Sequence, residues 1–363
     1  MSGPGTSRHR SRSGLRALTV AVAAAGLCLG MVPTVASATA PQVLFVASIT
    51  DCTVSGAAPA NKTIKVTWKD SDGSLKHVQT VKSSATGFFQ TTCDDSEQVE
   101  RGDVFTAKIG SSPPRSFTVP ALGFHIDRVA DTITGKGPAL TDLTMAFDGV
   151  PTTLTTTTLG DGTFDYDAHG KVDIIGAGRV TVSFKAGQGD IVQRSLQAPY
   201  LAAYRGSADI YMLGRPGSVV EVQLFNGSTN LADVDCTVGP TGGCWLTFTD
   251  ADGHPVRAQT GMRVVSTDIA SDADFVIPNV TVTGTPSSDV ISGTCLTGNP
   301  GAYYVTAWRA AGSGSVSRSG TTNAQGKFST DVTARFDLRS GDKILEECGL
   351  ATGDWIERRI TVP

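Results

Sequence analysis

The stretch that decides the fold runs from Ile291-Ser292-Gly293-Thr294-Cys295 to Arg359-Ile360-Thr361-Val362-Pro363. Three segments lie between these ends. The first is an expected strand that ends at Trp308, and it is followed by Thr322-Asn323-Ala324-Gln325-Gly326-Lys327-Phe328 and by Ser340-Gly341-Asp342-Lys343-Ile344. The closing signature recurs upstream as Phe117-Thr118-Val119-Pro120, Leu196-Gln197-Ala198-Pro199 and Phe275-Val276-Ile277-Pro278. A plan that returns at a fixed interval is typical of a tandem array.

The closing prolines set the module boundaries. Counted from Pro41, they fall at positions 120, 199, 278 and 363, which gives three intervals of 79 residues and one of 85. We therefore predict four small modules, at residues 41–120, 121–199, 200–278 and 279–363.

The first forty residues have the layout of an export signal. A basic segment from Arg8 to Arg16 precedes an apolar segment from Ala17 to Val32, and Ala36-Ser37-Ala38 or Ala38-Thr39-Ala40 offers a cleavage site. The apolar segment is too short for a permanent membrane span. We predict a Sec-type signal peptide at residues 1–40 and a secreted, extracellular mature chain without a membrane span. Lipid modification of Cys28 is the weaker alternative, because Leu27 stands where a small residue is expected.

The charge balance excludes some partners. The leader contains four of the 30 basic residues and no acid, so the mature chain has 26 basic residues against 34 acidic ones, a net charge of −8. An acidic chain without a basic run is a poor match for nucleic acid or an anionic membrane. We predict neither as a partner.

Six cysteines remain after the leader, two in each of three modules. Fifteen connectivities are possible for six cysteines, but only one keeps every pair inside its own module. This scheme joins Cys52 to Cys93, Cys236 to Cys244, and Cys295 to Cys348. Exported proteins form such bonds, so we predict three disulfides. A zinc site is the competing interpretation, and it lacks a C-x-x-C or clustered Cys/His spacing.

Hydrophobic alternation predicts strands throughout the mature chain. Ile64, Val66 and Trp68 alternate with polar residues, which is the pattern of a strand with one buried face. The run from Thr152 to Thr158 is interpreted as a strand, because threonine favours β structure. No segment after residue 40 keeps an apolar period of three to four residues over ten or more positions, so we predict an all-β protein.

The order of these motifs resembles the bacterial immunoglobulin-like domains that occur in tandem on secreted and surface proteins. The last module carries the resemblance as Ile291 and Gly293, Pro300-Gly301, Ala324-Gln325-Gly326-Lys327-Phe328-Ser329 and Gly341-Asp342-Lys343-Ile344. The third module adds Pro216-Gly217-Ser218-Val219-Val220-Glu221-Val222. The resemblance implies four immunoglobulin-like β-sandwich modules outside the cell, and it implies no activity. The cysteines depart from that family, and the first module lacks the Pro-Gly.

Catalytic and metal-binding patterns are weak. The sequence has no H-E-x-x-H, G-x-S-x-G or phosphate-binding glycine motif, so we predict no catalytic residue, cofactor or metal. Acidic turns such as Asp70-Ser71-Asp72-Gly73 and Asp250-Ala251-Asp252-Gly253 are interpreted as hairpin turns, with weak calcium binding as the alternative.

Aromatic residues are the remaining candidates for recognition. Trp68 and Trp308 recur at an equivalent place in their modules, so we expect both in the core. The alternation of Tyr303-Tyr304-Val305-Thr306-Ala307 by itself leaves the face of Trp308 open. Trp245 and Trp355 are less constrained: we expect both to be buried, with an exposed binding platform as the alternative, and they are the candidate binding aromatics. Tyrosines at 200, 204 and 211 crowd a module boundary, where we expect them to pack between neighbours.

The function predicted from these patterns is non-catalytic. We expect a monomeric extracellular binding or spacer protein of the bacterial cell surface, whose partner is a cell-envelope polysaccharide or an extracellular protein. The alternatives are a secreted hydrolase with its site at a module junction and a secreted enzyme inhibitor.

Overall fold

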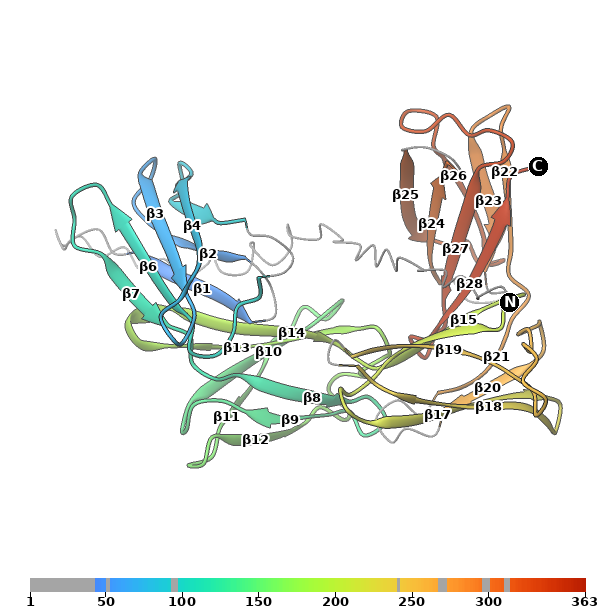
Figure 1. The fold of residues 1–363 in the computed structure, drawn as a ribbon, viewed down its shortest axis with the longest axis horizontal. Helices are drawn as coiled ribbons and strands as arrows, with labels where there is room; N and C mark the ends of the chain where they lie inside the picture. Colours follow the sequence, from blue (N-terminus) through green and yellow to red (C-terminus); the bar gives the residue numbers. More distant parts are fainter. Residues whose placement is uncertain are drawn as a thin grey trace, which may run out of the picture. The chain divides into compact units, whose positions relative to one another are not determined.

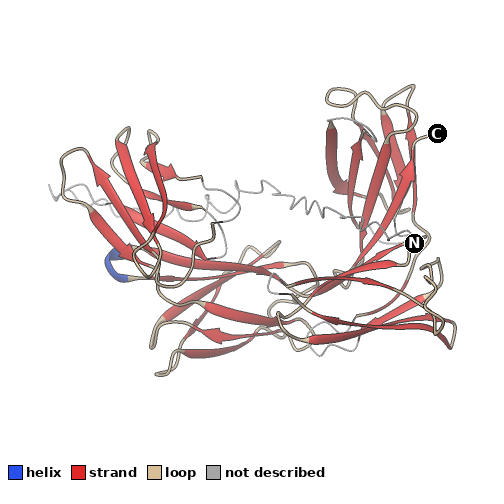
Figure 2. Cartoon of the chain, in the orientation of Figure 1, coloured by secondary structure: helices blue, strands red, loops and turns tan. Residues whose placement is uncertain are grey.

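The computed structural model describes residues 43–49, 53–92, 97–239, 242–266, 273–295, 301–309 and 314–363. Nearly every regular element in these residues is a strand, which confirms the all-β prediction (Figure 2). The predicted signal peptide and the predicted Cys52–Cys93 pair lie outside the described residues. None of the helices in the described part of the chain has the length and apolar character that a membrane span requires.

The first two predicted modules contribute the strands up to β14 (Figure 1). Those of residues 43–118 are β1 (Leu44–Ile49), β2 (Val54–Ala57), β3 (Thr63–Lys69), β4 (Leu75–Lys82), β5 (Phe88–Gln90), β6 (Val104–Ile109) and β7 (Arg115–Thr118). Those of residues 123–197 are β8 (Gly123–Asp127), β9 (Thr132–Lys136), β10 (Asp142–Phe147), β11 (Leu154–Thr157), β12 (Thr163–Asp167), β13 (Arg179–Lys185) and β14 (Ile191–Gln197), with a 3-10 turn η2 (Gly187–Gly189).

The last two predicted modules contribute β15 to β28 (Figure 1). Those of residues 200–276 are β15 (Tyr200–Tyr204), β16 (Asp209–Leu213), β17 (Val219–Asn226), β18 (Thr229–Thr237), β19 (Gly243–Thr247), β20 (Arg263–Ser266) and β21 (Asp274–Val276). Those of residues 281–361 are β22 (Thr281–Thr285), β23 (Val290–Thr294), β24 (Ala302–Trp308), β25 (Ser315–Thr321), β26 (Lys327–Asp331), β27 (Lys343–Gly349) and β28 (Trp355–Thr361).

The strands of the described residues assemble into six sheets. Four sheets lie within single predicted modules, with the orders β4-β3-β6-β7, β12-β9-β8, β18-β17-β20-β21 and β22-β23-β26. Two sheets have seven strands each, with the orders β11-β10-β13-β14-β1-β2-β5 and β19-β16-β15-β28-β27-β24-β25. We call these the first and the second seven-stranded sheet. Each runs across one predicted module boundary, so the modules are joined in pairs through the backbone.

A parallel strand pair makes each of these joints. In the first sheet β1 pairs with β14, and Val46 lies opposite Ile191. In the second sheet β15 pairs with β28, and Ala202 lies opposite Trp355. The first strand of one predicted module therefore pairs with the last strand of the following predicted module, and this arrangement occurs twice in the described residues.

A phenylalanine–glycine pair explains the glycine of the Ile-x-Gly motif. Phe328 lies opposite Gly293 on the neighbouring strand, and a Cβ atom on that glycine would come within 2.7 Å of the phenylalanine ring. Phe164 and Gly135 repeat this geometry. The Cβ atom on Gly293 would also overlap the Thr281 carbonyl oxygen, so a larger residue at Gly293 would push apart both the neighbouring strand and the ring.

Two hydrophobic cores are buried by these sheets. The first is formed by residues between Val43 and Ala198, and the second by residues between Leu201 and Val362. Each core therefore spans two predicted modules and lies under one seven-stranded sheet. The structure joins Cys295 to Cys348 as a disulfide in the second core, and it joins Cys236 on β18 to Cys244 on β19.

Candidate functional site

The outer face of the second seven-stranded sheet collects most of the large aromatic side chains that are not in a core. Along each strand, side chains alternate between the core and this outer face. In β15, Leu201 and Ala203 point into the second core, so Tyr200 and Tyr204 point outward. By the same alternation the outer face carries Tyr200, Tyr204, Tyr211, Trp245, Tyr304, Trp308 and Trp355, and we call this surface the aromatic face.

The rings on the module-three side form one contiguous group. The Trp245 ring lies 5.1 Å from the Tyr211 ring and 5.4 Å from the Tyr204 ring, and Tyr200 lies 6.0 Å from Tyr211. These centroid distances are those of interacting aromatic pairs. Trp245 is 60% exposed, so this group presents a wide indole surface to solvent.

Small residues let these rings lie against the sheet. Gly349 is directly opposite Trp355, and a Cβ atom there would touch the indole at 3.5 Å. A Cβ atom on Gly243 would lie 2.8 Å from the Tyr211 hydroxyl. The rings therefore occupy the space above these glycines.

Charged groups lie among the rings. Glu347 and Glu357 face each other across β27 and β28, and the Tyr204 hydroxyl donates a hydrogen bond to Glu357. Burial, reinforced by Glu357, raises the pKa of Tyr204, so its hydroxyl stays protonated as a donor. The Arg359 guanidinium lies 5.2 Å from the Tyr204 ring centroid in a cation–π contact.

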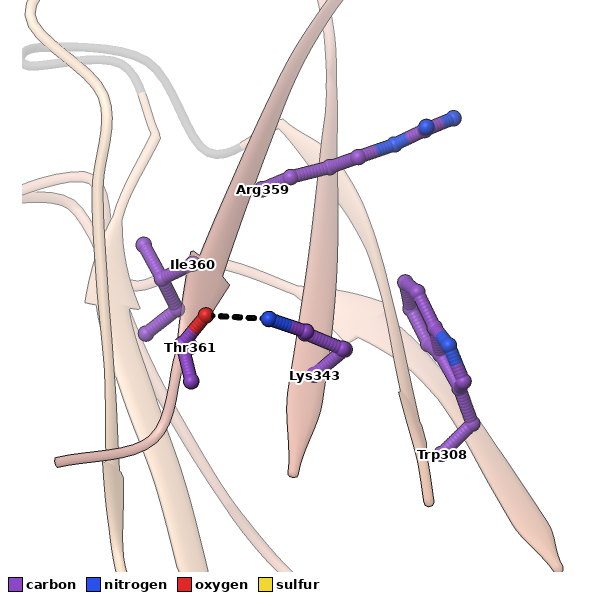
Figure 3. Close-up of a pocket in the computed structure, with 5 residues that line it drawn as sticks. All are labelled: Trp308, Lys343, Arg359, Ile360 and Thr361. Carbon is purple, nitrogen blue, oxygen red and sulfur yellow. Dashed lines mark hydrogen bonds between the residues drawn. The ribbon is translucent and has the colours of Figure 1, made fainter. Parts of the chain in front are cut away.

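A shallow depression of about 450 Å³ lies beside Trp308, at one end of the aromatic face (Figure 3). It is lined by Trp308, Lys343, Arg359, Ile360 and Thr361. The Lys343 ammonium donates a hydrogen bond of 2.6 Å to the Thr361 hydroxyl, beside the Trp308 indole.

The expected core position of Trp308 is wrong. Trp68 is 3% exposed in the first core and donates its indole N–H to Asp103 at 2.8 Å, but Trp308 is half-buried on the outer face. Phe105 and Ile344 are equivalent, because each is the second residue after a Gly-Asp motif. Phe105 lies opposite Trp68, whereas Ile344 lies opposite Ala307, the residue before Trp308. Trp308 is thus one position further along its strand, and one position turns a side chain to the other face.

The two candidate binding aromatics, Trp245 and Trp355, lie on the same face, in two different predicted modules. The expected burial is wrong for Trp245, which is 60% exposed, and Trp355 is half-buried. The three boundary tyrosines, expected between modules, lie on this face as well and contact one another or Trp245. Tyr304 was not singled out from the sequence, and its ring lies 5.6 Å from that of Trp355. The signal that identifies the group is its alternation with core residues, which only the sheet register makes visible.

The first seven-stranded sheet provides an internal comparison. Two buried aspartates align the sheets: Asp190 accepts the Phe45 N–H at 2.8 Å, and Asp354 accepts the Leu201 N–H at 2.9 Å. When Phe45 is matched to Leu201 and Asp190 to Asp354, each residue of the aromatic face has a counterpart at the same register position of the first sheet. In chain order of the aromatic residues, from Tyr200 to Trp355, these counterparts are Leu44, Ser48, Ser55, Gln90, Thr144, Asp148 and Ile191. Among the described residues, the same face of the first sheet carries a single aromatic, Phe88.

Two groups of possible metal ligands lie elsewhere in the part of the chain that the structure describes. In the acidic turn, Asp250 already accepts the backbone N–H groups of Asp252 and His254, and these bonds lower its pKa. Near the second disulfide, Cys295 and Cys348 are bonded to each other, which leaves Glu346 as the remaining ligand of that group. The turn geometry matches the predicted hairpin turns, and neither group is assigned a metal.

No protein-family model matches this chain, and no curated protein matches it. Among solved structures, a tetra-tandem repeat from the extending region of a large adhesion protein is 14% identical, with a TM-score of 0.18, over 89% of this chain and 100% of that one. The chicken CNTN1 FN1-FN3 domains are 10% identical, with a TM-score of 0.16, over 67% and 97%. Escherichia coli alpha-2-macroglobulin activated by porcine elastase is 11% identical, with a TM-score of 0.18, and the chain spans 43% of its length. TM-scores this low carry no argument about function.

Proposed function

We propose that this chain is a non-catalytic extracellular binding protein of the bacterial cell surface. The aromatic face of residues 200–363 binds a surface ligand, and residues 43–199 act as a spacer. The observation that carries the proposal is the contrast between the two seven-stranded sheets, which share their strand order and joint but differ in seven aromatic residues on one face. The sequence of the leader supports export.

The fold does not require these rings. The first seven-stranded sheet folds with polar or aliphatic residues at the same register positions, including Ser48, Ser55 and Gln90. Large apolar groups that remain exposed mark interaction surfaces in soluble proteins. Tryptophan and tyrosine are also the residues that dominate binding energy at interfaces.

The test exchanges aromatic residues for their counterparts. Full-length mature protein is incubated with envelope fractions in which either the protein or the polysaccharide has been destroyed. Trp245→Gln should weaken capture about 30-fold, since removal of a dominant interface side chain costs about 2 kcal/mol or more. The matched control, Gln90→Ala, changes the corresponding position of the first sheet and should leave capture unchanged.

Equal capture by the wild type and a folded Trp245→Gln, Trp355→Ile double variant would contradict a binding role for this face. Capture that Gln90→Ala also reduces would place the interaction elsewhere in the chain.

A further inference from the structure

We infer that the depression beside Trp308 binds an acidic sugar of a surface polysaccharide, with the sugar's carboxylate on Lys343 and Arg359 and its ring against the indole. This inference rests on the proposed function and specifies its ligand. Its basis is a group of two cations, one hydroxyl and one indole that the register brings together at this end of the second seven-stranded sheet.

The strand register places these side chains beside one another. Trp308 on β24 lies directly opposite Lys343 on β27, and Lys343 lies directly opposite Thr361 on β28. Residues directly opposite each other in an antiparallel pair have Cβ atoms about 4.5–5.5 Å apart. Arg359 precedes Thr361 by two residues, so it lies on the same face, about 7 Å away along β28. The four side chains therefore surround one small area of the outer face.

The two cations of the depression keep hydrogen-bond donors for a ligand. An ammonium group has three N–H donors, and Lys343 gives one of them to the Thr361 hydroxyl at 2.6 Å (Figure 3). Arg359 is exposed, and its guanidinium lies over the Tyr204 ring in a cation–π contact. A guanidinium in this position keeps N–H groups at the edge of its plane, where a carboxylate binds in a bidentate manner.

The acidic residues that neighbour these cations in the chain have partners of their own. Asp342, next to Lys343, is buried in an ion pair with Arg309. Glu357, on the same face as Arg359, is buried and accepts a hydrogen bond from a tyrosine hydroxyl. The lining of the depression therefore has two basic residues and no acidic one. Charges more than about 8 Å away are largely screened at physiological ionic strength, so the acidic remainder of the chain opposes this local attraction only weakly.

The same place in the first seven-stranded sheet has a balanced charge. In chain order, the counterparts of the four side chains are Asp148, Arg179, Ser195 and Gln197. They comprise one acid and one base, whereas the depression has two bases beside an indole. Because the two sheets share their strand order, the fold does not require this combination of side chains.

An indole beside two cations suits a sugar acid better than an acidic peptide. A sugar ring has a face of C–H groups that packs against an indole, and its carboxylate projects from the edge of the ring toward the cations. A peptide carboxylate stands at the end of a flexible side chain and brings no ring to Trp308. The volume of about 450 Å³ lies within the range of small-molecule sites, about 300–1,000 Å³.

The experiment measures binding of defined probes to the full mature chain by titration calorimetry. The probes are hexamers of galacturonate, guluronate and glucuronate, the carboxyl-reduced neutral form of each, and hexaglutamate. We expect at least one acidic sugar hexamer to bind at least tenfold more tightly than its neutral form and than hexaglutamate. That binding should weaken as the salt concentration rises, because salt screens the attraction between the ions.

The variants test the cations and the indole separately. Lys343→Gln and Arg359→Ser each remove one cation, and each should weaken binding of that acidic hexamer at least fivefold. Trp308→Leu should weaken binding of the acidic and the neutral form alike, because the ring contact does not depend on charge. Arg179→Gln, at the place of Lys343 in the first sheet, is the matched control and should leave binding unchanged. Circular dichroism checks that each variant is folded.

Equal binding of every acidic hexamer and its neutral form, binding of no sugar probe, or tightest binding of hexaglutamate would overturn the inference. Unchanged binding by folded Lys343→Gln and Arg359→Ser variants would overturn it as well. The envelope capture assay separates this failure from failure of the proposed function. Capture that still depends on Trp245 would leave the proposed function standing, and loss of that dependence would overturn both.

Discussion

At the scale of single residues, Glu346 is the least expected feature of the second core. It is fully buried on β27, and one of its carboxylate oxygens has no hydrogen-bond partner. The register places Val182 at the corresponding position of the first core. Burial raises the pKa of Glu346 to about 8, against a smaller opposite effect of Arg358 and Arg205. The carboxyl group is therefore largely protonated near neutral pH.

This pKa shift makes the stability of the second core depend on pH. The folded-state pKa lies above the unfolded value, so the stabilising contribution is complete below about pH 4.5 and is lost as the pH rises toward 8. The loss amounts to at most about 1.4 kcal/mol per pH unit. Glu346→Gln should remove this dependence and make the variant more stable than the wild type at pH 8. Denaturant midpoints of the wild type and the variant at pH 5 and pH 8 measure this difference in stability. Identical pH profiles for the two proteins would contradict the role of Glu346.

At the scale of elements, the parallel joints depend on buried aspartates. Asp190 accepts the N–H of Phe45 on β1 and binds both terminal nitrogens of Arg115, at 2.7 and 2.6 Å. Asp354 accepts the N–H of Leu201 on β15 and hydrogen-bonds Arg128 at 3.1 Å. In each joint, the carboxylate fixes the start of one strand beside its parallel partner, β1 beside β14 and β15 beside β28.

Loss of one of these carboxylates should weaken its joint strongly. Asp190→Ala leaves the Phe45 N–H without this partner and Arg115 without its counter-charge, and breaking a buried ion pair costs about 3–5 kcal/mol. Denaturant unfolding of the first core should report this loss. Asp142→Ala, which removes an exposed carboxylate hydrogen-bonded to Thr157, is the control and should change stability by less than about 0.5 kcal/mol. Similar effects for both substitutions would contradict a structural role for Asp190.

At the scale of the whole molecule, the described residues form two cores of similar construction, each shared by two predicted modules. Because each core is continuous across a module boundary, we expect the pair to be the cooperative unit. Tryptophan fluorescence can distinguish the unfolding of the two cores. Trp68 belongs to the first core, and the other three tryptophans lie on the sheet that covers the second core.

The disulfide between Cys295 and Cys348 should stabilise the second core alone. A bond that closes a loop with a sequence separation of 53 contributes about 4 kcal/mol by the loop-entropy estimate. The double variant Cys295→Ala, Cys348→Ala should lower the second unfolding transition in calorimetry and leave the transition reported by Trp68 in place. A single transition that shifts as a whole would show that the two cores unfold together.

Much of the strand pattern could be predicted from the sequence. The alternation of Ile64, Val66 and Trp68 becomes β3, with those three residues buried, and the threonine run contains β11. Trp308 was misplaced because tyrosines at 303 and 304 blur the alternation of β24, and a single-residue error reverses the face. The aromatic face could not be predicted as a unit, because its residues come from five strands in two modules.

The sequence by itself determined the all-β fold, the interval of the repeat and the identity of the two candidate tryptophans, because these depend on local alternation and on turn residues. Only the tertiary structure decided that β15 adds to β28 and that Trp245 and Trp355 share one surface. The physical reason is that hydrogen bonding between distant strands sets the register, and the register sets which side chains are neighbours across a sheet.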